Sequence, residues 1–150
     1  MTCQLFIIMR SKKFSQEWHD TNDPRSREVV IKYMKALGFN FHGNKVKWGV
    51  DLVSDFSHPM VALELEHRSI WDRDQYPYDI IHIPYRKLRY LGSNNVHYVV
   101  VNKEFNMIGI CLGKNLKEYL GVVTEVRNKA VSSGEYFINV PRAEFRWLKI

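Results

Sequence analysis

The sequence predicts a mixed α/β fold in which a central mixed β-sheet is flanked by helices. Three observations support this prediction. Apolar residues recur at helical spacing over 24–37, several short strand-like runs follow, and a second helical segment at 84–91 separates two groups of those runs. No internal repeat and no linker rich in Pro, Gly or Ser divides the 150 residues, so we expect one domain over 1–150.

The first helix is predicted from its end signals and its apolar face. Asp23 is a suitable N-cap, Pro24 fits the first helical position, and Gly38 is typical of a residue just past a helix end. Apolar side chains between these ends recur at helical spacing, namely Val29, Val30, Tyr33, Met34 and Leu37. We therefore expect a helix that starts at Pro24 and packs one face against the sheet.

The strands are predicted from alternation and from β-branched and aromatic runs. The segment VHYVVV at 96–101 is typical of a strand covered on both faces, and 107–113 is predicted to form a hairpin with it. Other strand-like runs lie at 39–42, 45–53, 60–67, 80–83, 135–140 and 144–150. We expect a loop at 69–79 and a third helix within 114–129.

The chain carries an excess of cations. Lys and Arg together number 22 against 16 acidic residues, which gives a net charge of +6 at pH 7, and aromatic residues make up 13%. This balance favours a polyanionic partner such as nucleic acid. A basic soluble protein without such a partner fits the same numbers.

Several classes of protein are disfavoured. No apolar run approaches the ~20 residues that span a bilayer, and the apolar start MTCQLFIIMR lacks the basic leader and cleavage site of a signal peptide. Cys3 and Cys111 have no metal-type spacing, so we expect free thiols in a reducing, cytoplasmic compartment. The six histidines form no zinc-binding pattern, and no nucleotide-binding or serine-hydrolase motif occurs.

Three charged residues share one face of the otherwise apolar segment VALELEHRS at 61–69. Because side chains alternate along a strand, Glu64, Glu66 and Arg68 all point the same way. Asp51 lies in the preceding apolar run, and a hairpin would set it opposite Glu64 or Glu66. Neighbouring carboxylates are costly to bury without a compensating partner. Alternatively, these acids line the solvent-exposed face of an antiparallel sheet.

A divalent cation would compensate these carboxylates. Mg²⁺ takes oxygen ligands, usually one or two carboxylates together with waters and a phosphate. We therefore expect a site for Mg²⁺, with Mn²⁺ as a substitute, at Asp51, Glu64 and Glu66. Arg68 is expected either to contact a phosphate or to neutralise Glu66.

The order of these residues resembles the PD-(D/E)XK nuclease superfamily. Asp51 is followed after twelve residues by Glu64-Leu-Glu66-His-Arg68, with a helix before this motif and a helix and a strand after it. The resemblance implies a restriction-endonuclease-like fold, a four-stranded mixed sheet flanked by helices, with its core at 24–113. It also implies that Asp51 and Glu64 bind Mg²⁺, which activates a water and stabilises charge on the phosphate.

The resemblance implies a Mg²⁺-dependent endonuclease that acts on double-stranded DNA as a homodimer or larger homo-oligomer. A free-standing chain of this size fits a site-specific enzyme of mobile-element or phage type, such as a homing endonuclease. Two alternatives share the fold: a Holliday-junction-type structure-specific nuclease and a catalytically inactive nucleic-acid-binding module. A further alternative is a protein-interaction domain in which the three charges form an exposed face.

The sequence departs from the family motif at its lysine. If Glu64 is the family acid, Glu66 takes the lysine position, and if Glu66 is the acid, Arg68 takes it. Arginine cannot act as a general base, since it keeps its proton in proteins. Both registers favour a metal-bound hydroxide, with Glu66 as ligand or base.

The second helical segment carries three candidate DNA contacts, Arg86, Lys87 and Arg89, interleaved with aromatic residues. In the superfamily this helix lies near the metal site, so Arg86 or Lys87 could supply the missing cation. The alternative for each residue is a solvated basic helix face.

Two further regions are candidates for DNA contact. Lys45 and Lys47 precede Asp51 and need only reach a backbone phosphate. The loop WDRDQYPYD at 71–79 contains three aromatic residues. It is predicted either to contact DNA or to pack over the sheet edge through Trp71.

Overall fold

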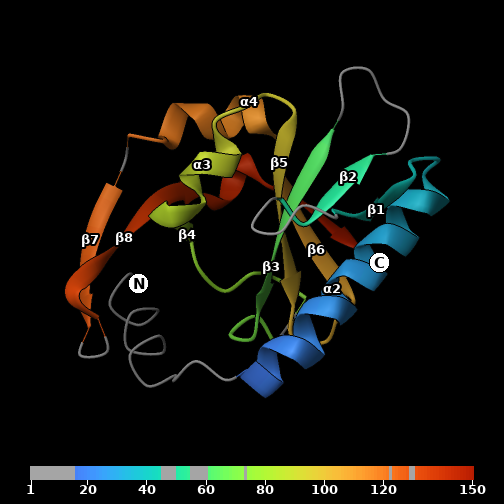
Figure 1. Ribbon diagram of the computed structural model, residues 1–150, viewed down its shortest axis with the longest axis horizontal. Helices are drawn as coiled ribbons and strands as arrows, with labels where there is room; N and C mark the ends of the chain where they lie inside the picture. Colours follow the sequence, from blue (N-terminus) through green and yellow to red (C-terminus); the bar gives the residue numbers. More distant parts are fainter. Residues whose placement is uncertain (1–15, 45–49, 55–60, 73, 122, 129–130) are drawn as a thin grey trace.

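The computed structural model describes residues 16–44, 50–54, 61–72, 74–121, 123–128 and 131–150 (Figure 1). Its main feature is a six-stranded mixed sheet in the order β1-β2-β3-β5-β6-β9. Strands β3 and β5 are parallel, and the other neighbours are antiparallel. The strands are β1 (Phe41–Gly43), β2 (Leu52–Ser54), β3 (Ala62–Arg68), β5 (Val96–Asn102), β6 (Met107–Cys111) and β9 (Arg146–Lys149).

A second sheet has three antiparallel strands in the order β4-β8-β7. These are β4 (Ile80–Pro84), β7 (Val123–Asn128) and β8 (Val131–Pro141). The long strand β8 therefore lies between an early and a late segment of the chain. In Figure 1 this second sheet lies on the left, and the six-stranded sheet lies between it and the blue helix α2 (Gln16–Ala36).

The helices other than α2 are short. A 3₁₀ turn η1 (Tyr85–Lys87) leads into α3 (Leu88–Leu91), and α4 (Gly113–Leu116) leads into the 3₁₀ turn η2 (Lys117–Tyr119). A third 3₁₀ turn, η3 (Arg142–Glu144), joins β8 to β9. Among the described residues, no helix is long and apolar enough to cross a membrane.

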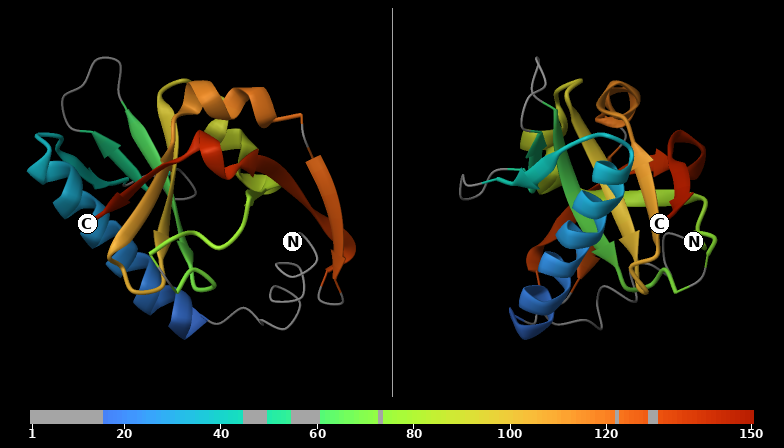
Figure 2. Two further views of the ribbon diagram at one scale, coloured as in Figure 1. Left: turned by 180° about the vertical axis from the view of Figure 1, so that it is seen from behind. Right: turned by 90° about the vertical axis from the view of Figure 1, so that its right-hand side faces the viewer.

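Each face of the six-stranded sheet has its own core. On one face, α2 lies across the sheet (Figure 2). Val30 and Met34 of α2 belong to the same buried cluster as Leu63 and Leu65 of β3. On the other face, buried residues of the large sheet pack against β4 and β8. This second core includes Tyr98, Val100, Cys111, Ile81, Ile83, Ile138, Val140, Trp71 and Phe145. The large sheet is thus covered on both sides, as expected for strands rich in β-branched residues.

Strand β3 explains how apolar and charged residues alternate in one buried segment. Leu63 and Leu65 face α2, where full burial stabilises the fold by roughly 1.5–3 kcal/mol each. Glu64, Glu66 and Arg68 alternate with them and face the second sheet. Glu64 and Arg68 are buried, so this is not the exposed face of an antiparallel sheet.

The fold class agrees with the prediction of a mixed α/β protein with a central mixed sheet, but three helix predictions are wrong. The second helix was expected to start at Pro84, which ends β4 instead, and α3 starts only at Leu88. α2 begins at Gln16 and contains Pro24 in its interior, whereas we expected the helix to start at Pro24. The predicted end is confirmed, because Gly38 has φ +92° and its N–H donates to Lys35 O at 3.0 Å. The expected helix within 114–129 is only α4 and η2, since the segment after Gly121 is rich in β-branched residues and pairs with β8.

Candidate functional site

The hairpin of β2 and β3 brings Asp51 to Glu64. The register pairs Val53 with Ala62 and Leu52 with Leu63, so the next pair in sequence is Asp51 and Glu64. The two carboxyl groups lie close enough for each to shift the pKa of the other. The sequence prediction that a hairpin would set these two acids opposite each other agrees with this geometry.

Asp51 is held by two donors from different elements. The backbone N–H of Leu65 donates to Asp51 Oδ2 at 2.8 Å, and Arg27 Nη2 of α2 donates to Asp51 Oδ1 at 2.9 Å. The Asp51 side chain is 15% exposed. Both carboxylate oxygens therefore have fixed partners, which holds the group in one orientation beside Glu64.

Glu64 pairs with a lysine from the second sheet's side of the molecule. Lys87 Nζ of η1 lies 3.3 Å from Glu64 Oε2 and 3.4 Å from the carbonyl oxygen of Leu65. The side chains of Glu64 and Lys87 are 6% and 14% exposed. The Lys87 ammonium therefore lies beside the pair of carboxyl groups. It contacts Glu64 Oε2, an atom that could instead bind a metal ion.

The two carboxyl groups differ in acidity. Burial, together with the hydrogen bond and the negative charge of Asp51, raises the pKa of Glu64 to about 8, although Lys87 opposes the shift. The pKa of Asp51 is lowered, although burial alone would raise it. Hydrogen bonds from Glu64 and from the Leu65 N–H, together with the positive charges of Lys87 and Arg27, outweigh the effect of burial. At neutral pH the metal-free pair thus holds one proton, and this proton lies on Glu64.

Glu66 does not contact the Asp51–Glu64 pair but is held by Tyr98 and Arg68. It accepts a short hydrogen bond from the Tyr98 hydroxyl, and its Oε2 lies 3.5 Å from Arg68 Nη2. Arg68, Lys87, Tyr98 and Arg86 together outweigh burial and lower the pKa of Glu66, so it is a carboxylate at neutral pH. Its charge is thereby compensated within the protein.

Arg68 links this second group to the three-stranded sheet. Its Nη2 donates to the carbonyl oxygen of His82 in β4 at 2.5 Å and to the Tyr98 hydroxyl at 3.2 Å. The His82 ring in turn lies 2.6 Å from Asn139 Oδ1 of β8. A buried polar chain therefore crosses from β3 to β8, and Arg68 acts as a carboxylate partner, one of its two predicted roles.

The residues present fit a metal ion held by two carboxylates rather than three. Within the described ranges, no group of three or more His, Cys, Asp and Glu side chains could hold a metal. Asp51 and Glu64 meet, whereas Glu66 is engaged by Tyr98 and Arg68. Mg²⁺ commonly binds through one or two carboxylates and keeps several waters. The Asp51–Glu64 pair meets this requirement, and the expected third ligand does not join it.

The predicted DNA contacts are described only in part. Lys87 lies at the acids, and Arg86 is exposed on η1 close enough to lower the pKa of Glu66. Lys45, Lys47 and the side chain of Arg89 lie outside the described residues. Their predicted role therefore stays a prediction.

The aromatic loop at 71–79 packs into the protein. Trp71 is fully buried and Tyr76 is 1% exposed, and their rings meet edge to face. The packing alternative is therefore confirmed for these two residues, and they are not available as surface contacts.

Two residues of the site were not predicted. Arg27 lies on the first helix, where the sequence showed only a polar surface position. Tyr98 lies in the run VHYVVV, where it was expected as a core residue. No local signal in the sequence marks Tyr98, because its place on the charged face follows from the parallel register that pairs it with Glu64.

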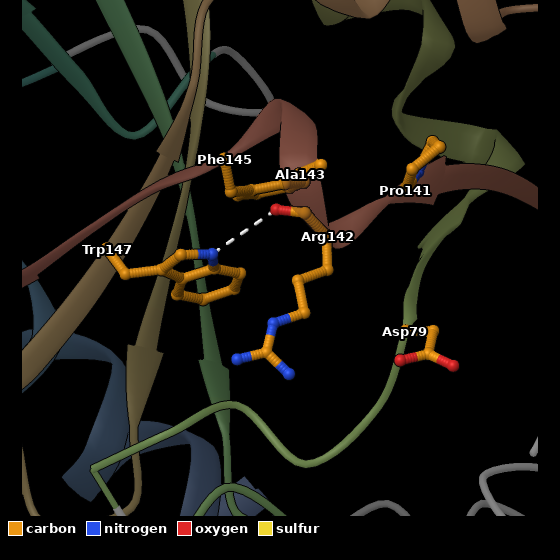
Figure 3. A pocket seen from close by; sticks show the side chains of 6 residues that line it. All are labelled: Asp79, Pro141, Arg142, Ala143, Phe145 and Trp147. Atoms are coloured by element: carbon orange, nitrogen blue, oxygen red, sulfur yellow. Dashed lines mark hydrogen bonds between the residues drawn. The ribbon is translucent and has the colours of Figure 1, made fainter.

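A hollow of about 390 Å³ lies elsewhere, between the start of β4 and the connection from β8 to β9 (Figure 3). Its lining consists of Asp79, Pro141, Arg142, Ala143, Phe145 and Trp147, and Trp147 Nε1 donates to the Arg142 carbonyl oxygen at 3.2 Å. It contains neither Asp51 nor Glu64. Because its walls offer one carboxylate and no paired acids, we assign the candidate chemistry to the acidic pair and not to this hollow.

A comparison with protein-family models found no match, and a comparison with curated proteins found none. The functional argument therefore rests on the geometry of the site.

Proposed function

We propose that the chain is a metal-dependent nuclease that hydrolyses phosphodiester bonds in DNA, with Asp51 and Glu64 as the metal-binding residues. The observation that carries this proposal is the pair of the half-buried Asp51 and the buried Glu64, with the Lys87 ammonium 3.3 Å from Glu64. Burying two carboxylates is costly, and a perturbed acid beside a fixed cation is typical of a functional site.

The topology supports a restriction-endonuclease-like core. A helix, α2, precedes an antiparallel pair, β2 and β3, which carries the acids. A short helix, α3, then precedes β5, which is parallel to β3. The neighbouring strands β1-β2-β3-β5 form a four-stranded mixed sheet of the kind that the superfamily resemblance implies. In this assignment the additional strands β6 and β9 extend that core.

The side chains suggest a division of roles. A divalent ion at Asp51 and Glu64 would supply an activated water and stabilise negative charge on the phosphate. Asp51 is oriented by Leu65 N–H and Arg27, so its geometry is set before any ligand arrives. The Lys87 ammonium can donate to a phosphate oxygen when the substrate phosphate approaches Glu64.

Lys87 takes the place of the motif lysine in this proposal. The sequence left open whether Glu66 or Arg68 stands in the lysine position, and both side chains are engaged in a structural ion pair. Lys87 reaches the acids from η1 instead. A cation is thus available at the acids without a lysine in β3.

A plasmid-cleavage experiment tests the proposal. The wild-type protein with Mg²⁺ or Mn²⁺ is expected to nick or linearise supercoiled DNA, and chelation is expected to stop the reaction. Asp51→Asn and Glu64→Gln should lower the rate about 1,000-fold, equivalent to about 4 kcal/mol of lost transition-state stabilisation. Glu28→Gln, which removes an exposed carboxylate from α2, is the matched control and should keep the wild-type rate.

One observation favours a second candidate, a nucleic-acid-binding module without catalysis. Lys87 and Arg27 already pair with the two acids, so the site is compensated without a metal ion. Such a module would shift the mobility of DNA but leave a plasmid intact at every metal concentration. The same experiment therefore separates the two candidates.

A further inference from the structure

Two exposed tyrosines lie where β4 leads into η1, the turn that also carries Lys87. The β4–β8 ladder pairs Ile83 with Ile138 and Pro84 with Phe137, so Tyr85 and Tyr136 are the next pair. Their rings meet edge to face with centroids 6.4 Å apart. The ladder thus ends in an aromatic pair just where the chain turns into η1.

Both tyrosines are open to solvent. Tyr85 is 42% exposed and Tyr136 is 46% exposed, whereas most aromatic residues of the neighbouring core are buried. An edge-to-face contact uses the face of only one ring, so aromatic surface remains available for a third ring. Two large aromatic side chains left exposed side by side indicate a binding surface.

Cations follow Tyr85 on η1, whereas Tyr136 pairs with Glu125 of β7 and follows Glu135 in the chain. Tyr85 is followed directly by Arg86, which is exposed, and by Lys87, which reaches Glu64. The Cα atoms of Tyr85 and Lys87 can be no more than about 7.6 Å apart, which is about two nucleotide steps along a stacked strand. A strand whose phosphate lies at Lys87 would therefore pass the turn that carries Tyr85 within about two nucleotides.

We infer that Tyr85 and Tyr136 form a stacking platform for an unpaired nucleobase next to the scissile phosphate, so that the substrate is locally unpaired or single-stranded DNA. This inference rests on the proposed nuclease function. Bases inside a duplex are already stacked on both faces, whereas an unpaired base has a free face for an aromatic side chain. The adjacent cations match the negative backbone of such a strand.

A binding experiment in the presence of a chelator tests the platform separately from cleavage. The probes are a DNA duplex with a short unpaired stretch that contains one 2-aminopurine and a fully paired duplex of the same sequence. The wild-type protein is expected to bind the unpaired probe more tightly and to quench its fluorescence. Tyr85→Ala and Tyr136→Ala should each weaken this binding at least about fivefold, the lower end for one base stacked on an aromatic side chain.

Two sets of control variants sharpen the test. Tyr85→Phe and Tyr136→Phe keep the ring and should retain the binding and the quenching. Phe39→Ala removes an exposed aromatic residue (59% exposed) outside the pair and should have no effect. Equal affinity for both probes, or a preference that survives both alanine substitutions, would overturn the inference.

Cleavage assays on the same probes distinguish this inference from the proposed function. Metal-dependent cleavage without a preference for unpaired DNA would overturn the platform alone. A preference that depends on the tyrosines but comes with no cleavage would support the platform as a binding surface and count against the nuclease.

Discussion

The ammonium of Lys87 lies 3.3 Å from the carboxylate of Glu64, although the two residues come from different parts of the sequence and lie on η1 and β3. The contact places a fixed cation beside a buried acid pair. In the proposed nuclease, Lys87 would take the place of the motif lysine that β3 lacks. The chemistry that we propose depends on this relationship, so it is the first to be tested by substitution.

Replacing Lys87 by Met should separate catalysis from DNA binding. The substitution keeps the aliphatic stem and removes the charge, so we expect the cleavage rate to fall about 100-fold because a donor to the phosphate is lost. Affinity for DNA should fall far less, since one cation is a small part of the total backbone attraction. Rates and affinities are measured on the same oligonucleotide.

The matched control for this variant is Lys114→Met, which removes an exposed lysine of α4. It should leave the cleavage rate unchanged. Cleavage by Lys87→Met at the wild-type rate would show that the contact with Glu64 has no role in catalysis.

The raised pKa of Glu64 predicts how the stability of the metal-free protein depends on pH. The pKa of about 8 in the folded state exceeds the ordinary value of 4.5, so the folded state holds more protons between these values. The free energy of unfolding should therefore fall as the pH rises through this window, by at most about 1.4 kcal/mol per pH unit. The lowered pKa of Asp51 acts below its ordinary value of 3.8 and lies outside the window.

Urea denaturation of the wild-type protein and of Glu64→Gln at pH 6.5, 7.25 and 8 measures this effect. The difference between the two proteins isolates Glu64 from His82 and His97, whose lowered pKa values act in the opposite direction below pH 6.5. The variant should gain stability relative to the wild type as the pH rises. A constant difference would contradict the assignment of the shared proton to Glu64.

Arg27→Met should weaken metal binding without removing a ligand. Arg27 donates to Asp51 at 2.9 Å, and loss of such an orienting partner typically lowers metal affinity 10- to 100-fold. Titration calorimetry with Mn²⁺ measures the change. Arg25→Met is the control on the same helix, since Arg25 lies over the Phe105 ring and not at Asp51.

Arg68→Met should destabilise the fold more than it alters the metal site. The substitution leaves Glu66 without its buried cation and the His82 carbonyl without its donor, so we expect a loss of about 3–5 kcal/mol in the free energy of unfolding.

Urea denaturation measures this loss. The control Arg146→Met, at an exposed position of β9, should change the free energy of unfolding by less than about 0.5 kcal/mol. The double variant Glu66→Gln with Arg68→Met should recover part of the loss, and no recovery would contradict the pairing.

Local patterns in the sequence were enough to predict part of the site. Side-chain alternation placed Glu64, Glu66 and Arg68 on one face, and the predicted hairpin placed Asp51 opposite Glu64 or Glu66. The register selects Glu64. These relationships span few residues and follow from strand geometry alone. They account for the acid pair but not for its partners.

Local patterns did not specify most of the partners because these depend on long-range packing, and Lys87 was a candidate only through the family resemblance. The second sheet joins β4 to β8, more than fifty residues later, and no local pattern specifies that pairing. The contact of Arg68 with His82 and the place of Lys87 follow from this sheet. Glu66 as a third ligand stays a prediction, because alternation assigns a face and not a partner, and Tyr98 and Arg68 engage Glu66 on that face.

The most direct test of the central claim is a crystal structure of the protein grown with Mn²⁺, in which anomalous scattering locates the ion. The account predicts one peak within coordination distance of both Asp51 and Glu64, with the Lys87 ammonium displaced from Glu64. It also predicts that Glu64→Gln loses the peak. An acid pair that keeps its contact with Lys87 and shows no peak at saturating Mn²⁺ would contradict the claim that these two carboxylates share a metal ion.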